Sequence, residues 1–300
     1  MRPIFAYLML ICLVPTPAGA IDELPAYLIR LPDSVKTVFV AETSAAAFHR
    51  FDNAANTKVD YQGTHYMSIG ENGDGKQDDG DRRTPLGIYF VTEQLDTSKL
   101  HEKYGVTAFT LDYPNAWDRR MRRTGDGIWV HGVDRRGGKR PPLDTDGCIA
   151  LPNNTLTKLE DRFQPNVTPV VIARELKWMD REALGELRAR LDNAVSRWAE
   201  SLQHGDMHAY LSLYDDDFRH WGMNKTEWTV FSVENLGSRS IKKVTVSDLL
   251  LLADPAEDEI YLSRFRLSID EASNTVEVTK RLYWRVAGSG DLKIIAEDSG

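Results

Sequence analysis

The sequence has little cysteine, no excess of positive charge and no hydrophobic run long enough to cross a membrane. Two cysteines in 300 residues exclude a disulfide-rich scaffold. The formal net charge of -8 argues against a general nucleic-acid-binding protein, which needs a basic surface. The apolar run over residues 4–14 is shorter than the roughly twenty residues of a membrane-spanning helix. We therefore expect no membrane span and no nucleic-acid partner.

The N-terminus has the three parts of an export signal. Arg2 is followed by the apolar run 4–14, and Ala18-Gly19-Ala20 is the small-residue pattern of a cleavage site. The sequence therefore predicts a cleaved signal peptide over residues 1–20 and a periplasmic or extracytoplasmic protein. Cleavage would remove Cys12 and leave Cys148 as the one cysteine of the mature chain. Such a thiol is either a small buried hydrophobe or a reactive group.

Length and composition predict two globular domains, since 300 residues exceed a typical single domain and 42% of them are hydrophobic. A polar lead occupies residues 22–34. β-branched and alternating stretches then predict a mainly β N-terminal domain over residues 35–174. Its expected strands lie near residues 35–41, 45–52, 66–70, 88–91, 103–115 and 168–173.

The character of the chain changes after Arg174. Residues 175–190 are charged and helix-forming, and we interpret them as a helical linker. Residues 191–300 predict a second domain in which helices precede strands, an α+β arrangement. We expect its helices within residues 192–217 and a run of strands from Trp228 onward, over residues 240–252, 259–269, 275–286 and 292–296.

Residues 70–87 are rich in glycine and acidic side chains, which invites comparison with a calcium-binding loop. Lys76 stands where a third oxygen ligand is needed, and no glutamate closes the loop at the twelfth position. We therefore expect a solvated turn between strands, and no metal or cofactor.

Cys148 and His131 are the residues best suited to covalent chemistry. A nearby imidazole can take the proton of a thiol and later return it to a leaving amine. His131 follows Ile-Trp-Val at an expected strand end, and Gly147 before the cysteine allows backbone amides to face a bound carbonyl. Thr145 and Asp146 supply short polar side chains to hold this turn. Sequence spacing does not show that the two side chains meet, so the interpretation of Cys148 as an inert cysteine stays open.

Two arginine-rich runs flank these residues despite the acidic overall charge. Arg119 and Arg120 belong to the first, and Arg136 and Arg140 to the second. One interpretation is solvated loops. The other is a positive environment that attracts a substrate with carboxylates.

Two motifs resemble the L,D-transpeptidase catalytic domain, also called the YkuD domain. His131-Gly132 followed by Thr145-Asp146-Gly147-Cys148 is similar to the family's His-Gly and Ser/Thr-x-Gly-Cys pattern. Upstream, residues 80–89 are similar to the family's Gly-Asp-x-x-Thr-Pro-x-Gly-x-Tyr/Phe segment. The resemblance implies a β-sandwich acting on peptidoglycan stem peptides at the bond between diaminopimelate and D-alanine.

The same resemblance implies roles for single residues. Cys148 would be the nucleophile, His131 the general base and acid, and the Gly132 carbonyl the group that orients the imidazole. The amides of Gly147 and Cys148 would face the oxyanion.

The sequence departs from the family pattern at two positions near the nucleophile. Asp146 replaces a histidine that most members have, and Ala150 replaces an arginine that many have. Asp-Gly-Cys variants look like the branch that contains L,D-carboxypeptidases governing cell shape.

The C-terminal part resembles a nuclear-transport-factor-2-like (SnoaL-like) domain. The residues that carry the resemblance are Val195, Trp198, Gly205-Asp206, Tyr210-Leu211, Tyr214 and Asp217-Phe218. This implies a curved sheet and helices that form a cone. We expect it to serve in binding or in homodimerisation, since the fold alone does not define a function.

Three functional hypotheses follow. The first is a transpeptidase, which passes the acyl group to an amine. The second is a hydrolase of the same stems, either a carboxypeptidase or an endopeptidase. The third is a wall-binding scaffold in which Cys148 is inert.

Overall fold

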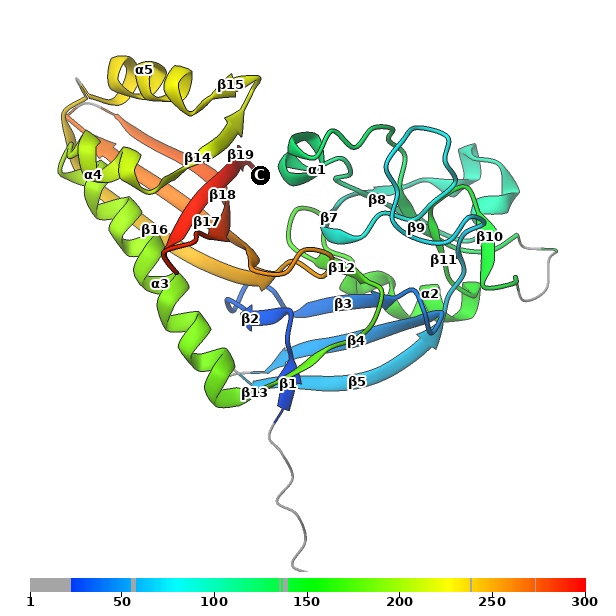
Figure 1. Ribbon diagram of the computed structural model, residues 1–300. Helices are drawn as coiled ribbons and strands as arrows, with labels where there is room; N and C mark the ends of the chain where they lie inside the picture. The colour runs from blue at the N-terminus through cyan, green and yellow to red at the C-terminus, as the bar shows by residue number, and fades with distance from the viewer. Residues whose placement is uncertain (1–22, 55–57, 135, 137–139, 238, 273) are drawn as a thin grey trace, which may run out of the picture.

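The computed structural model describes residues 23–54, 58–134, 136, 140–237, 239–272 and 274–300. The expected signal peptide lies outside these residues. Two domains lie side by side, as Figure 1 shows, with the C-terminal domain on the left and the N-terminal domain on the right. Strands dominate the N-terminal domain, and the C-terminal domain combines helices with a sheet in an α+β arrangement, both as the sequence predicted. None of the helices in the described ranges is long and apolar enough to span a membrane.

An eight-stranded sheet forms the N-terminal domain, in the order β11-β9-β8-β7-β12-β3-β4-β5. Its strands are β3 (Thr37–Glu42), β4 (Ala47–Ala54), β5 (Lys58–Tyr66), β7 (Gly87–Leu95), β8 (Ala108–Leu111), β9 (Trp129–His131), β11 (Ile149–Ala150) and β12 (Pro169–Ala173). A parallel pair, β6 (Ile69–Gly70) and β10 (Leu143–Thr145), lies beside it. The connections contain η1 (Thr97–Lys99), η2 (Glu102–Tyr104), α1 (Ala116–Arg120), α2 (Asn153–Leu159) and η3 (Glu160–Arg162).

The centre of this sheet follows from its sequence. All five residues of β12 are buried, and the strand is continuously apolar, as expected for a strand covered on both faces. On one face, Phe163 stacks on Phe39 and Phe109, with ring centroids 4.4 Å apart in both pairs. This core fixes β7, β8 and β12, and so supports the neighbouring β9 and β11 that carry the site.

The C-terminal domain is a seven-stranded sheet, in the order β15-β14-β19-β18-β17-β16-β2. Its strands are β2 (Leu28–Arg30), β14 (Tyr214–His220), β15 (Met223–Asn224), β16 (Ile241–Ala253), β17 (Ile260–Glu271), β18 (Thr275–Val286) and β19 (Leu292–Ser299). Helices α3 (Arg181–Gln203), α4 (Met207–Ser212) and α5 (Lys225–Leu236) accompany the sheet. Leu184, Leu191 and Trp198 of α3 are buried in its core, at the spacing of one helix face.

Three expectations about chain organisation differ from the structure. The polar lead contains two strands: β1 (Glu23–Pro25) pairs with β13 (Trp178–Asp180), and β2 joins the C-terminal sheet. The stretch 175–190, expected as a helical linker, contains β13 before α3 begins at Arg181, and α3 continues to Gln203 because its apolar face packs on the C-terminal core.

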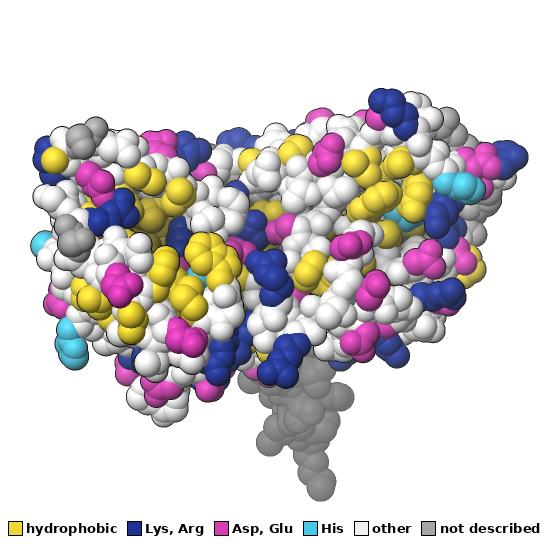
Figure 2. All heavy atoms as spheres, turned by 90° about the horizontal axis from the view of Figure 1, so that it is seen from above, with side chains coloured by type: hydrophobic (Ala, Val, Ile, Leu, Met, Phe, Trp, Pro, Cys, Tyr) yellow, Lys and Arg dark blue, Asp and Glu magenta, His cyan; other side chains and the backbone are white. Residues whose placement is uncertain are grey.

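The third difference is α5, where the sequence predicted strand from Trp228. Its β-branched and aromatic residues favour strand. A capping box between Asn224 and Glu227 starts a helix instead. Val230 and Val233 remain exposed on α5. Seen from above in Figure 2, hydrophobic side chains are exposed on the half that holds this domain and also on the other half.

A shared hydrophobic core joins the two domains. Val38, Ile88 and Phe90 of the N-terminal domain are clustered with Leu262 and Tyr283 of the C-terminal sheet. Their combined burial makes the two domains one packed unit, since the apolar area removed from water is the main stabilising contribution.

A polar contact crosses the same boundary. Arg281 donates to the Asp112 carboxylate, and its guanidinium lies 4.9 Å from the Phe90 ring centroid.

Candidate active site

A pocket of about 410 Å³ contains both residues proposed for the chemistry. Cys148 and His131 line it. Its walls are mostly charged or polar, formed by Lys76, Asp79, Gly80, Arg82, Lys103, Tyr104, Asp126, Gly127, Arg140, Thr145 and Asp146. The sequence-predicted pair therefore shares one cavity, and four cationic side chains lie around it.

Strand pairing brings the two residues together. His131 ends β9, and Cys148 directly precedes β11. These strands run parallel, with Val130 opposite Ile149 and His131 opposite Ala150. The sheet thus holds the histidine at the end of one strand and the cysteine just before the start of the adjacent one.

The His131 side chain is held in one tautomer. Its Nδ1 lies 2.6 Å from the carbonyl oxygen of Gly132. A carbonyl only accepts, so Nδ1 carries the proton and Nε2 keeps a free lone pair. The Tyr104 ring packs edge-on against the imidazole at 5.2 Å between centroids. Burial lowers the pKa of His131 to about 4, and the charges of Arg140 and Lys103 act in the same direction.

The Cys148 thiol is protonated at rest. Its Sγ donates to the Gly127 carbonyl oxygen at 3.4 Å. Burial raises its pKa to about 11; a hydrogen bond with the Trp129 backbone opposes this, and the Asp146 carboxylate adds to it. With the histidine neutral as well, the resting pair is uncharged, and the thiol needs a base at the moment of attack.

The turn before the cysteine is fixed by two threonines. Thr145 Oγ1 donates to the Cys148 carbonyl oxygen at 2.7 Å and accepts from the Gly147 amide at 3.1 Å. Thr84 Oγ1 donates to the Gly147 carbonyl oxygen at 2.9 Å. The amides of Gly147 and Cys148 were both expected to face an oxyanion. The Gly147 amide instead donates to Thr145, which leaves the Cys148 amide as the candidate donor of the two.

Gly147 itself is required by its backbone. Its φ is 122°, and an added Cβ would lie 2.8 Å from the carbonyl oxygen of Arg83. Only glycine fits such a position without strain.

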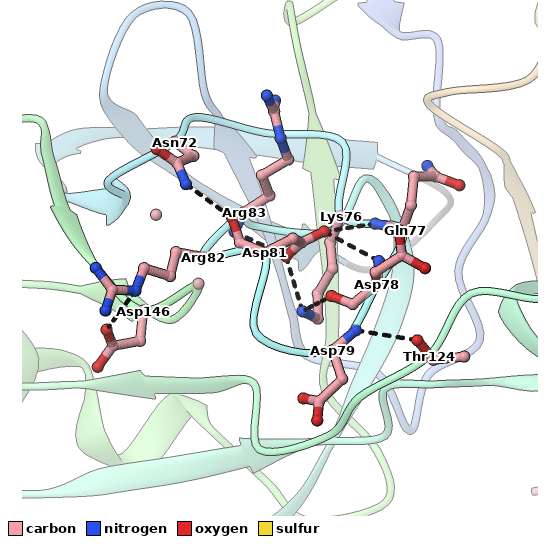
Figure 3. Close-up of polar contacts among 12 residues, drawn as sticks. Asn72, Lys76, Gln77, Asp78, Asp79, Asp81, Arg82, Arg83, Thr124 and Asp146 are labelled. Carbon is pink, nitrogen blue, oxygen red and sulfur yellow. Dashed lines mark hydrogen bonds and ion pairs between the residues drawn. The ribbon is translucent and has the colours of Figure 1, made fainter.

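The acidic loop between β6 and β7 is organised by a lysine. Lys76 is 3% exposed and donates to Asp81 Oδ1 at 2.9 Å and to the Asp78 carbonyl oxygen at 2.8 Å. Asp81 Oδ2 also accepts from the Gln77 amide at 2.8 Å, as Figure 3 shows. The Lys76 ammonium thus lies inside the glycine-rich acidic turn, the segment whose composition resembles a calcium-binding loop.

Asn153 secures the loop that follows the histidine. Its Oδ1 accepts from the Val133 amide at 3.0 Å, and its Nδ2 donates to the Val133 carbonyl oxygen at 2.8 Å. Close packing of Gly132 against Gly105 leaves no room for a Cβ at either position. No motif in the sequence pointed to Asn153, whereas Thr84 belongs to the upstream segment quoted for the family.

The four arginines proposed to bind substrate are not together. Arg140 lines the pocket, held by the side chain and carbonyl of Asp144. Arg136 is exposed and pairs with Glu102. Arg119 and Arg120 line a different pocket of about 530 Å³, together with residues of the C-terminal domain. Of the four, Arg140 is thus the arginine that the structure places beside Cys148.

Asp146 sits at the rim of the pocket and is 70% exposed. Its carboxylate lies 3.5 Å from Lys103 Nζ and 3.9 Å from Arg82 Nε. Neither Lys103 nor Arg82 was singled out from the sequence.

Comparison with protein families matches the two domains separately. Residues 44–172 match the L,D-transpeptidase catalytic domain, YkuD. Residues 190–298 match the Cds6 C-terminal NTF2-like domain. The chain thus carries an L,D-transpeptidase-family catalytic domain followed by an NTF2-like domain.

Two solved structures share this two-domain fold. Bd1075 of Bdellovibrio bacteriovorus is 24% identical with a TM-score of 0.76, over 93% of this chain and 98% of its own. The helical cell shape determining protein Pgp2 from Campylobacter jejuni is 23% identical with a TM-score of 0.77, over 91% of this chain and 95% of its own. A search of curated proteins gave no match.

Proposed function

We propose that this protein is an exported cysteine enzyme that modifies peptidoglycan, forming an acyl-enzyme on stem peptides at the diaminopimelate–D-alanine bond. One observation carries the proposal: Cys148 shares a pocket with His131, whose Nδ1 is committed to the Gly132 carbonyl and whose Nε2 is free to act as a base. The L,D-transpeptidase-family domain around this pair supports the peptidoglycan substrate.

The chemistry uses the pair in its uncharged form. Nε2 of His131 takes the thiol proton as Sγ of Cys148 attacks the carbonyl carbon. The tetrahedral oxyanion collapses, the bond to the D-alanine nitrogen breaks, and the imidazolium returns the proton to that nitrogen. D-Alanine leaves, and a thioester to Cys148 remains. Water or an amine, deprotonated by the same imidazole, then attacks the thioester and releases the thiol.

Transpeptidation and hydrolysis share the first half of this reaction. The Asp146 position, which resembles the carboxypeptidase-containing branch, favours water as the second reactant. The fold similarity to Pgp2 supports a role in cell shape. The same proposal includes export through a signal peptide over residues 1–20, which N-terminal sequencing of the secreted protein tests. It also includes homodimerisation through the C-terminal domain, which sedimentation of the mature chain tests.

The experiment is incubation of the mature protein with stem tetrapeptide, with and without an acceptor amine. We expect D-alanine release, with tripeptide formed by hydrolysis and a cross-linked product formed by transpeptidation. The variant Cys148→Ala should release none while its circular dichroism spectrum is unchanged. Stem binding without release by the wild-type protein would instead support the scaffold hypothesis, and turnover by Cys148→Ala would contradict the proposed nucleophile.

A further inference from the structure

Asp146 connects two cations from different parts of the chain at the mouth of the site. Lys103 lies in η2, and Arg82 lies in the loop between β6 and β7. Figure 3 shows Arg82 reaching from this loop toward Asp146. All three residues line the same pocket as Cys148. A single carboxylate, two residues from the nucleophile, therefore holds both cations.

This bridge is weak. The 3.5 Å and 3.9 Å separations exceed the roughly 2.7–2.9 Å of a charge-assisted hydrogen bond. The side chains of Lys103, Arg82 and Asp146 are 46%, 54% and 70% exposed, and exposed ion pairs contribute little to stability. Another carboxylate can replace Asp146 at small cost.

The other two cations of the pocket are committed. Lys76 is buried and bound by Asp81. Arg140 is bound by the side chain and carbonyl of Asp144. Among the pocket cations described, Lys103 and Arg82 are the two that face Asp146, an exposed carboxylate that another carboxylate can replace.

The environment of each exchangeable cation orients it. Glu71 binds Nη1 of Arg82 and leaves the Nε edge facing Asp146. Lys103 Nζ lies 5.1 Å from the Tyr104 ring centroid, and Tyr104 packs edge-on against His131. An anion bound by Lys103 is thus separated from His131, the proposed base, by the Tyr104 ring.

We propose that Lys103 and Arg82 bind the terminal carboxylate of the peptide and that Asp146 occupies their site until the peptide arrives. One carboxylate replaces another, so the local charge balance is kept once Asp146 turns to solvent. The enzyme then requires a free C-terminus on its donor and acts on chain ends rather than inside cross-links. This inference rests on the proposed function and specifies the substrate of the same pocket.

The test compares two synthetic tetrapeptides that end in D-alanine or in D-alaninamide, with kcat and KM measured for release of the last residue by the mature protein. We expect the free acid to be preferred by roughly ten- to a hundred-fold in kcat/KM, as for the loss of a hydrogen bond to a charged group. Lys103→Met should reduce this preference toward one through KM, and Lys103→Arg should restore part of it. Asp146→Asn should lower KM for the acid, because the competing carboxylate is gone. Lys99→Met is the matched control, since Lys99 is 81% exposed in the neighbouring turn.

The outcomes separate the two proposals. Equal turnover of acid and amide by the wild-type protein overturns the inference and leaves the proposed function standing. A Lys103→Met variant that loses acid and amide turnover equally, or an Asp146→Asn variant with a raised KM for the acid, also overturns it. Turnover of neither peptide by the wild-type protein overturns the proposed function and the inference with it.

Discussion

Thr84 donates its hydroxyl proton to the carbonyl oxygen of Gly147 at 2.9 Å and accepts from the Gly70 amide at the same distance. It is 0% exposed. The motif upstream of β7 is thereby attached to the turn that precedes the proposed nucleophile. This contact gives the Thr-Pro part of that motif a physical function, which is to hold the cysteine turn in place.

Replacing Thr84 by valine should reduce both stability and turnover. The change keeps the shape but leaves a buried amide and a buried carbonyl without partners, at a cost of roughly 1–3 kcal/mol for each group. Urea unfolding and kcat/KM for D-alanine release are the measurements. Thr84→Ser keeps the hydroxyl and should retain most of both. Wild-type stability in Thr84→Val would show that the two contacts contribute little.

The pH dependence of turnover should reveal the pKa of His131, the proposed base. Because the pKa of His131 is lowered to about 4, its imidazole is neutral and able to accept a proton above that pH. We expect kcat/KM to fall as the pH drops through about 4 and to stay level from there toward the thiol pKa of about 11. Circular dichroism at each pH separates this loss from unfolding. A half-maximal rate near pH 6.5 would contradict the lowered pKa.

The same two groups should shape stability. The pKa of His131 in the folded protein, about 4, lies below the 6.5 of an ordinary histidine. The unfolded chain therefore binds more protons there, and stability falls as the pH drops from 6.5 to about 4. The pKa of Cys148 in the folded protein, about 11, lies above the 9.0 of an ordinary cysteine. The unfolded chain therefore loses its proton first, and stability falls as the pH rises from 9 to about 11. Each contribution is on the order of 3 kcal/mol. Urea unfolding of the wild type, His131→Gln and Cys148→Ala across this range measures it; variants that keep the wild-type slopes would refute the assignment.

Asn153→Ala should impair turnover more than stability. Without its amide, the backbone of Val133 loses both partners and the loop after His131 is free to shift. A misplacement of about 1 Å in a catalytic site can cost as much as a hundred-fold, so we expect kcat to fall by roughly ten-fold or more. Asn154→Ala is the matched control, because its side chain is adjacent and exposed. Equal kinetics in the two variants would remove Asn153 from the site.

Arg281→Met should loosen the joint between the domains. It leaves the Asp112 carboxylate beside Phe90 without its cation, and breaking a buried ion pair typically costs about 3–5 kcal/mol. Thermal unfolding measures the loss. Adding Asp112→Asn should recover part of it, because the uncompensated charge is removed. Arg266→Met, at an exposed position of the neighbouring β17, is the control; a loss as large as that of Arg281→Met would contradict the argument.

Sequence reasoning found what depends on local pattern. The strands around β12 were predictable because their β-branched runs are buried on both faces, and the family resemblance rested on motifs near Cys148 and Thr84. The convergence of Lys103 and Arg82 on Asp146 was not predictable, because the three residues lie in separate segments that meet only in the folded chain. Arg119 and Arg120 were expected near the substrate, but α1 directs them toward the C-terminal domain.

The strand β2 has a consequence for the order in which the molecule can be completed. Leu28 and Arg30 pair with β16, near the other end of the chain, and Ile29 is fully buried in the C-terminal core. A fragment that begins after α3 would present the backbone edge of β16 to solvent, and such edges recruit strands from other molecules. The first strand synthesised in this sheet therefore pairs only after β16 has been made, more than 200 residues later in the chain.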